Sequence, residues 1–196
     1  MKQLKKKIYK AETKEERKML YAMHTLKKQL KPGDVFLVHG NHLLSRIIRI
    51  VTDSHWNHAT LYMGQGRLIE ANVHGVGIRP IEVYAHKDIE VYRHNRITDK
   101  HRSKIVYHAM KKIGKDYDFL QIIQLLFYFL FNIRGNARKI GTANRYICSE
   151  LVAESYLHAG LRVYKNYNPT KISPADFSES TCFKLCVQRK NVLLLR

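Results

Sequence analysis

Short runs rich in β-branched and aromatic residues, broken by turn residues, predict the strands of a small sheet. These runs lie at residues 34–39, 58–63, 67–71 and 88–93. The tight-turn sequence Gly64-Gln-Gly66 separates the second run from the third. We therefore expect these two runs to pair antiparallel, which would bring Glu70 close to opposite Leu61.

Apolar residues at helical spacing predict helices around these strands. The clearest helix starts at Cys148, buries Leu151, Val152 and Ala159 on one side, and stops at Gly160. Further helices are predicted at residues 43–51 and at 99–113 after a Thr98 cap, and a closing hairpin at 183–187 and 192–195 with its turn at 188–191. This pattern predicts the α+β class, with a small antiparallel sheet packed against helices on one side.

The chain of 196 residues, 45% of them hydrophobic, is long enough for one domain with a proper core. Residues 1–31 hold ten lysines and one arginine against three glutamates and read as a basic amphipathic helical extension. Its apolar stripe is expected to consist of Met19, Leu20, Met23, Leu26 and Leu30. The domain itself is predicted to cover residues 32–196. Since the amino terminus does not read as an export signal, we expect a cytoplasmic protein that binds peripherally at a membrane.

An apolar helical segment is predicted at residues 119–143, just ahead of Cys148. Its most apolar part, residues 119–133, would span about 22 Å at about 1.5 Å per residue, short of the roughly 30 Å hydrocarbon core. We expect either a buried helix or a surface that dips into a bilayer or holds an acyl chain. The net charge of +19 makes an anionic membrane surface an expected partner. Nucleic acid is not expected, because no recognised binding module is present.

Cys148 carries the candidate chemistry. The first turn of a helix favours thiolate over thiol, and the thiolate is the nucleophilic form. Such a nucleophile needs a base and a group that orients the base. His58 opens one predicted strand, and Glu70 lies on its neighbour. Each residue also has a purely structural interpretation. Cys148 would then be a small apolar residue at the start of a buried helix stripe, His58 a structural histidine, and Glu70 an exposed residue of its strand.

No metal site and no cofactor are predicted. The three cysteines and eleven histidines show neither finger-like spacing nor an HExxH arrangement. The odd number of cysteines also argues against a disulfide framework, and Cys182 and Cys186 are read as core positions of a terminal strand.

Several strings, in this order, resemble the YiiX/YaeF-like branch of the NlpC-type papain-like superfamily. They are Pro32-Gly-Asp-Val-Phe-Leu-Val38, Leu44-Ser-Arg-Ile-Ile48, His58-Ala-Thr-Leu-Tyr62, Arg67-Leu-Ile-Glu-Ala71, Gly114 with Tyr117-Asp118, Tyr146-Ile-Cys-Ser-Glu-Leu-Val152 and Ser173-Pro-Ala-Asp176. The resemblance implies a circularly permuted papain-like fold, in which the histidine precedes the cysteine. It maps Cys148 to the nucleophile, His58 to the general base and Glu70 to the third member, and it places Tyr146 and Tyr117 at the substrate.

The function implied is that of a cysteine hydrolase of the amidase or peptidase type. It would cleave an amide or ester bond through a thioester, and the basic and apolar segments suggest a lipid-linked or cell-envelope peptide as substrate. Two alternatives remain open. One is a lipid acyltransferase or phospholipid acylhydrolase using the same three residues, and the other is a non-catalytic lipid-binding module at a membrane surface. The sequence predicts no oligomeric state.

Overall fold

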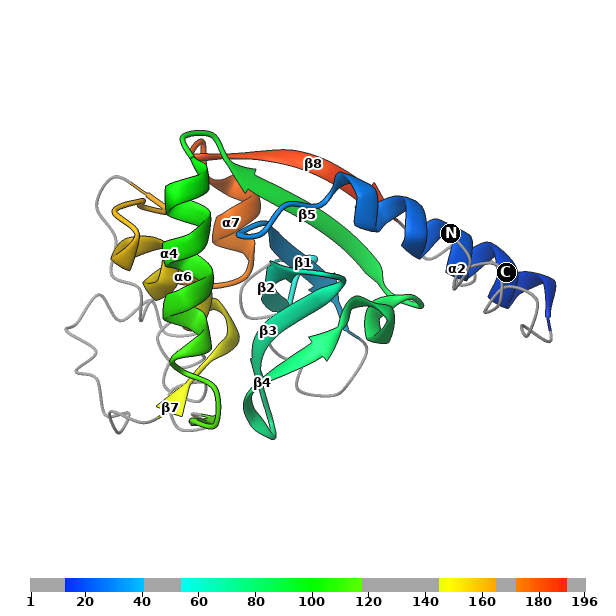
Figure 1. The fold of residues 1–196 in the computed structure, drawn as a ribbon, viewed down its shortest axis with the longest axis horizontal. Coiled ribbons are helices and arrows are strands. Elements are labelled where there is room, and N and C mark those ends of the chain that lie inside the picture. The colour runs from blue at the N-terminus through cyan, green and yellow to red at the C-terminus, as the bar shows by residue number, and fades with distance from the viewer. Residues whose placement is uncertain (1–12, 41–53, 118–144, 165–171, 190–196) are drawn as a thin grey trace.

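The computed structural model describes residues 13–40, 54–117, 145–164 and 172–189. Its helices are α2 (Lys14–Gln29), α4 (Asp99–Met110), α6 (Cys148–His158) and α7 (Ala175–Glu179), with a 3₁₀ turn η1 at Ile81–Tyr84. Its strands are β1 (Val35–His39), β2 (His58–Gly64), β3 (Arg67–Asn72), β4 (Gly75–Pro80), β5 (Asp88–His94), β6 (Asp116–Tyr117), β7 (Arg145–Tyr146) and β8 (Phe183–Arg189). These elements are arranged as Figure 1 shows.

Six strands form one antiparallel sheet in the order β4-β3-β2-β1-β5-β8, as the predicted α+β class requires. Strand β4 was not predicted, because it contains two glycines and ends in a proline. Such residues are depleted in strands but tolerated at a sheet edge, where β4 lies. The sequence interpretation therefore missed one outer strand while identifying its neighbours.

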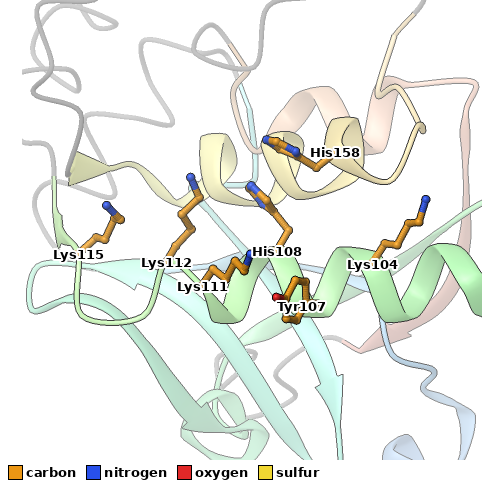
Figure 2. A pocket seen from close by; sticks show the side chains of 7 residues that line it. All are labelled: Lys104, Tyr107, His108, Lys111, Lys112, Lys115 and His158. Atoms are coloured by element: carbon orange, nitrogen blue, oxygen red, sulfur yellow. The ribbon is translucent and has the colours of Figure 1, made fainter.

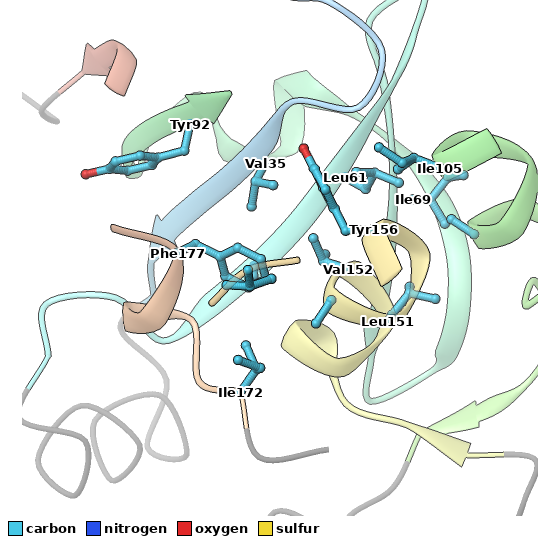
Figure 3. Close-up of a cluster of buried hydrophobic side chains, with 14 of the residues drawn as sticks. Val35, Leu61, Ile69, Tyr92, Ile105, Leu151, Val152, Tyr156, Ile172 and Phe177 are labelled. Atoms are coloured by element: carbon cyan, nitrogen blue, oxygen red, sulfur yellow. The ribbon is translucent and has the colours of Figure 1, made fainter. Parts of the chain in front are cut away.

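One face of the sheet packs against α4 and α6 to form the main core, shown in Figure 3. Leu61 and Ile69 from the strands meet Ile105 of α4 and Leu151 and Val152 of α6, as predicted for the stripe of the last helix. The hydroxyl of Tyr156, which is fully buried, donates a hydrogen bond to the Gly33 carbonyl just before β1. These contacts fix α6, and with it Cys148, against the sheet.

The opposite face of the sheet is covered by α2, so helices lie on both sides and not on one side as predicted. Met23 and Leu26 of α2, together with Leu30 behind it, pack on Phe36 and Leu68. A capping box at Thr13 starts this helix. Three residues of the predicted apolar stripe are thus buried against the domain, while Met19 and Leu20 are only partly buried.

Two details near the C-terminus differ from the sequence interpretation. Strand β8 continues through Gln188 and Arg189, which were predicted as a turn, because both extend the ladder with β5. Cys182 precedes β8, and neither it nor Cys186 is a buried core position. The predicted strand 192–195 and the helical segments 43–51 and 119–143 lie outside the described residues. Within the described ranges, no helix is both long and apolar enough to cross a membrane.

Candidate active site

Neighbouring strands β2 and β3 carry the imidazole and the carboxylate of the candidate site. His58 is the first residue of β2, and Glu70 lies near the end of β3. His58 Nε2 is 3.1 Å from Glu70 Oε2. This contact leaves Nδ1 as the ring nitrogen available to another partner.

The hairpin of β2 and β3 folds about Gln65, as predicted. Leu61 pairs with Ile69, so Glu70 lies one residue beyond the position opposite Leu61, and a bulge interrupts the ladder between Tyr62 and Gly64. Because side chains alternate between the two faces of a strand, this register puts Glu70 on the same face of the sheet as His58.

The candidate nucleophile lies where α6 meets the start of β2. Cys148 is the first residue of α6, directly after the N-cap residue Ile147, and is only 7% exposed. Its sulfur is within hydrogen-bonding reach of the His58 ring and of the backbone N–H groups of Ala59 and Ser149. The structure thus brings Cys148, His58 and Glu70 into one connected group.

The electrostatics of this group favour its charged forms. Burial opposes the Cys148 thiolate, but the His58 charge and the hydrogen bonds from His58, Ala59 and Ser149 outweigh burial and lower the thiol pKa. Burial likewise opposes the His58 imidazolium, yet the Cys148 and Glu70 charges and hydrogen bonds raise its pKa to about 10. The contacts of Glu70 overcome its own burial and lower its pKa to about 2. These shifts all favour the thiolate, the imidazolium and the carboxylate over the neutral forms of the three side chains.

Glu70 is held by three further side chains that the sequence interpretation did not identify. Tyr84, at the end of η1, donates its hydroxyl to Oε2, the oxygen that also faces His58. Asn72 Nδ2 donates to Oε1 at 2.8 Å, and Arg79 Nε lies 3.5 Å from the same oxygen. Burial and the Glu70 charge raise the pKa of Tyr84, so its hydroxyl remains a donor. The alternation of β3 could have indicated Asn72 beside Glu70, but no sequence signal points to Tyr84.

The two tyrosines expected at the substrate lie on a short parallel ladder. Tyr117 in β6 is opposite Tyr146 in β7, and β7 ends two residues before Cys148. The ladder therefore brings both backbone positions next to the start of α6. Their side chains lie outside the described part of the structure, so their contact with substrate stays a prediction.

A metal-binding arrangement is present elsewhere among the described residues. His108, Glu154 and His158 place one possible ligand atom each within 4.8 Å of one another. They lie on α4 and on the later turns of α6, away from the thiol at the start of that helix.

Comparison with known proteins identifies the family. Residues 29–182 match the model of a family described as permuted papain-like amidase enzyme, YaeF/YiiX, C92 family. No curated protein matches the chain. A similar solved structure is the crystal structure of metalloprotein yiiX from Escherichia coli O157:H7, with a TM-score of 0.63 and 20% identity over 83% of this chain and 99% of that chain. At this identity the likeness to that structure shows the fold alone. The match over most of the chain confirms the predicted resemblance, and the protein belongs to the YaeF/YiiX family of permuted papain-like amidases, which are papain-like cysteine hydrolases.

Proposed function

We propose that the protein hydrolyses an amide bond with Cys148 as nucleophile, His58 as general acid and base, and Glu70 as the carboxylate that orients His58. One observation carries the proposal. The Cys148 sulfur contacts the His58 imidazole, which in turn contacts the Glu70 carboxylate, and the pKa shifts of the three groups favour a thiolate–imidazolium pair beside a carboxylate.

In the first half of the reaction, the Cys148 thiolate attacks the carbonyl carbon of the substrate. The negative charge then moves to the carbonyl oxygen, where the backbone N–H of Cys148 at the start of α6 is a suitable donor. As the C–N bond breaks, the His58 imidazolium gives its proton to the leaving nitrogen. The amine departs, and the acyl group stays on sulfur as a thioester.

In the second half, water attacks the thioester carbonyl while neutral His58 accepts the proton of the water molecule. The C–S bond breaks, and the acid product leaves. The Cys148 thiolate and the His58 imidazolium are thereby restored. Glu70 keeps its charge throughout and holds the ring through Nε2.

We propose a lipid-linked or cell-envelope peptide as the substrate class. The net charge of +19 supports attraction to an anionic surface or substrate, and the apolar run at residues 119–133 ends fifteen residues before the nucleophile in the sequence. An anionic membrane surface is accordingly the partner that we propose.

The test uses short peptides with an amide-linked coumarin reporter, with and without a palmitoyl chain. We expect the wild-type protein to release the coumarin and to show an acyl adduct on Cys148 by mass spectrometry, while Cys148→Ala does neither. Cys186→Ala serves as the matched control, because Cys186 is half-buried on β8 and should not affect turnover.

Two results would replace this proposal with an alternative. An acyl adduct formed only with phosphatidylglycerol and phosphatidylethanolamine vesicles, and never with the peptides, would indicate a lipid acyltransferase or acylhydrolase. Vesicle binding that persists in Cys148→Ala, without turnover of any peptide or lipid, would indicate a non-catalytic binding module.

A further inference from the structure

A basic hollow of about 520 Å³ lies between α4 and α6, as Figure 2 shows. It is lined by Lys104, Tyr107, His108, Lys111, Lys112, Lys115 and His158. Cys148 begins α6 and His158 ends it. At about 1.5 Å per residue, the two are separated by roughly 15 Å of helix. The hollow is therefore separate from the proposed reaction centre.

Two imidazoles and one carboxylate meet at this hollow. Glu154 and His158 are four residues apart on α6 and so share one face of the helix, and His108 comes from α4. The two imidazole rings stack with their centroids 3.8 Å apart, side by side in Figure 2, so the exposed His158 ring has to turn out of this stack for both ring lone pairs to point at one ion. Two histidines and a glutamate, with a fourth position open, are a ligand set that holds zinc in proteins.

A hydrogen bond fixes the ring of His108 in a state suited to metal binding. The Ser155 hydroxyl donates to the Leu151 carbonyl at 2.7 Å, so its oxygen is left to accept. His108 Nδ1 lies 3.3 Å from that oxygen and donates to it. The neutral ring then has its lone pair on Nε2. Histidines that bind metals in proteins are commonly oriented in this way through the other ring nitrogen.

The carboxylate of the group has no hydrogen bond at one of its oxygens. Glu154 Oε2 is buried, makes no hydrogen bond to any described residue, and lies 3.4 Å from Lys112 Nζ. A metal ion at this position would displace the lysine ammonium. The lysines of the hollow disfavour ions held by charge alone, such as Ca²⁺ or Mg²⁺, whereas Zn²⁺ also gains from bonding to two imidazoles.

We propose that His108, Glu154 and His158 bind one zinc ion, which joins α4 to α6, the helix that begins with Cys148. The ion stabilises the contact between the two helices and takes no part in the proposed proton transfers. Lys112 competes with the ion for Glu154 and weakens its binding.

The test is a Zn²⁺ titration against a chromogenic chelator, with the untagged full chain in a Cys148→Ala background that removes the reactive thiol. We expect one site per chain. His158→Gln and His108→Gln should each weaken binding at least about tenfold, and Lys112→Gln should strengthen it. His74→Gln is the matched control, since His74 is exposed and lies outside the group. Zn²⁺ should also raise the melting temperature of the background protein but not that of His158→Gln.

The proposal is overturned if His158→Gln binds Zn²⁺ as tightly as His74→Gln does, or if Lys112→Gln weakens binding. His158 is exposed, so its substitution should leave the fold intact and decides the question even if His108→Gln unfolds.

Discussion

Replacing Glu70 by glutamine tests whether the carboxylate sustains the reactive thiolate. The pKa of Glu70 falls from 4.5 to about 2, with His58 as its largest favourable contact. At about 1.4 kcal/mol per pKa unit, this net shift, which burial opposes, sets the scale of the stabilisation of the ion pair by Glu70 at about 3 kcal/mol. Without the negative charge the His58 imidazolium is less stable, so the Cys148 pKa rises. We expect the Cys148 pKa to rise by about two units, by the same conversion.

The assay is the rate of Cys148 alkylation by iodoacetamide as a function of pH. At pH values below the midpoint of the wild-type alkylation profile, Cys148 of Glu70→Gln should react up to about 100-fold more slowly than Cys148 of the wild-type protein. At high pH, where Cys148 is ionised in both proteins, the two rates should converge. Glu90→Gln is the matched control. Glu90 is also a buried strand glutamate, and it accepts hydrogen bonds from Tyr92 at 2.7 Å and from Gln188 at 2.6 Å. It lies on β5, however, and is not among the groups that raise the His58 pKa, whereas Glu70 is. An unchanged midpoint in Glu70→Gln, with both variants folded, would refute this reasoning.

Three further predictions follow from the same contacts. Tyr84→Phe removes a hydrogen bond to the Glu70 carboxylate and should lower the free energy of unfolding by about 1.5–3 kcal/mol in urea denaturation. Tyr84→Phe should shift the pH midpoint of Cys148 alkylation less than Glu70→Gln does. A larger shift would contradict the proposal that the Glu70 carboxylate stabilises the His58 imidazolium. Leu26 is only 4% exposed, so Leu26→Ala should lower the free energy of unfolding by about 2–5 kcal/mol without shifting the midpoint of Cys148 alkylation. The rate of peptide hydrolysis should fall at low pH, where the Cys148 thiolate is protonated, and at high pH, as the pH rises through the His58 pKa of about 10 and the imidazolium loses its proton. A rate that keeps rising above that pH would exclude His58 as the proton donor.

Local sequence signals were sufficient for the elements that carry the site. The Thr98 cap and the Gly160 stop set the ends of two helices through interactions within a few residues, and both are present in the structure. The strand of His58 was likewise recognisable from its own composition. Such signals act within one element, which is why the start of α6 at Cys148 could be predicted from sequence.

Features that depend on how separate elements meet could not be predicted. The Gly64-Gln-Gly66 pattern predicted a tight turn, in which all three residues have positive φ, but it did not predict the bulge after Tyr62. Tyr84 reaches Glu70 from a turn fourteen residues away. His108 meets His158 only because α4 packs on α6, so a search by sequence spacing does not find the pair.

The order of the permuted site also has a consequence for synthesis of the protein. His58 and Glu70 leave the ribosome before Cys148, and about ninety residues separate the imidazole from the sulfur. At roughly 5–20 residues per second, translation of that interval takes about 5–18 s. Strands β1 to β5 are complete well before the thiol is made, and the nascent chain therefore has no nucleophile until most of its sheet can already have formed.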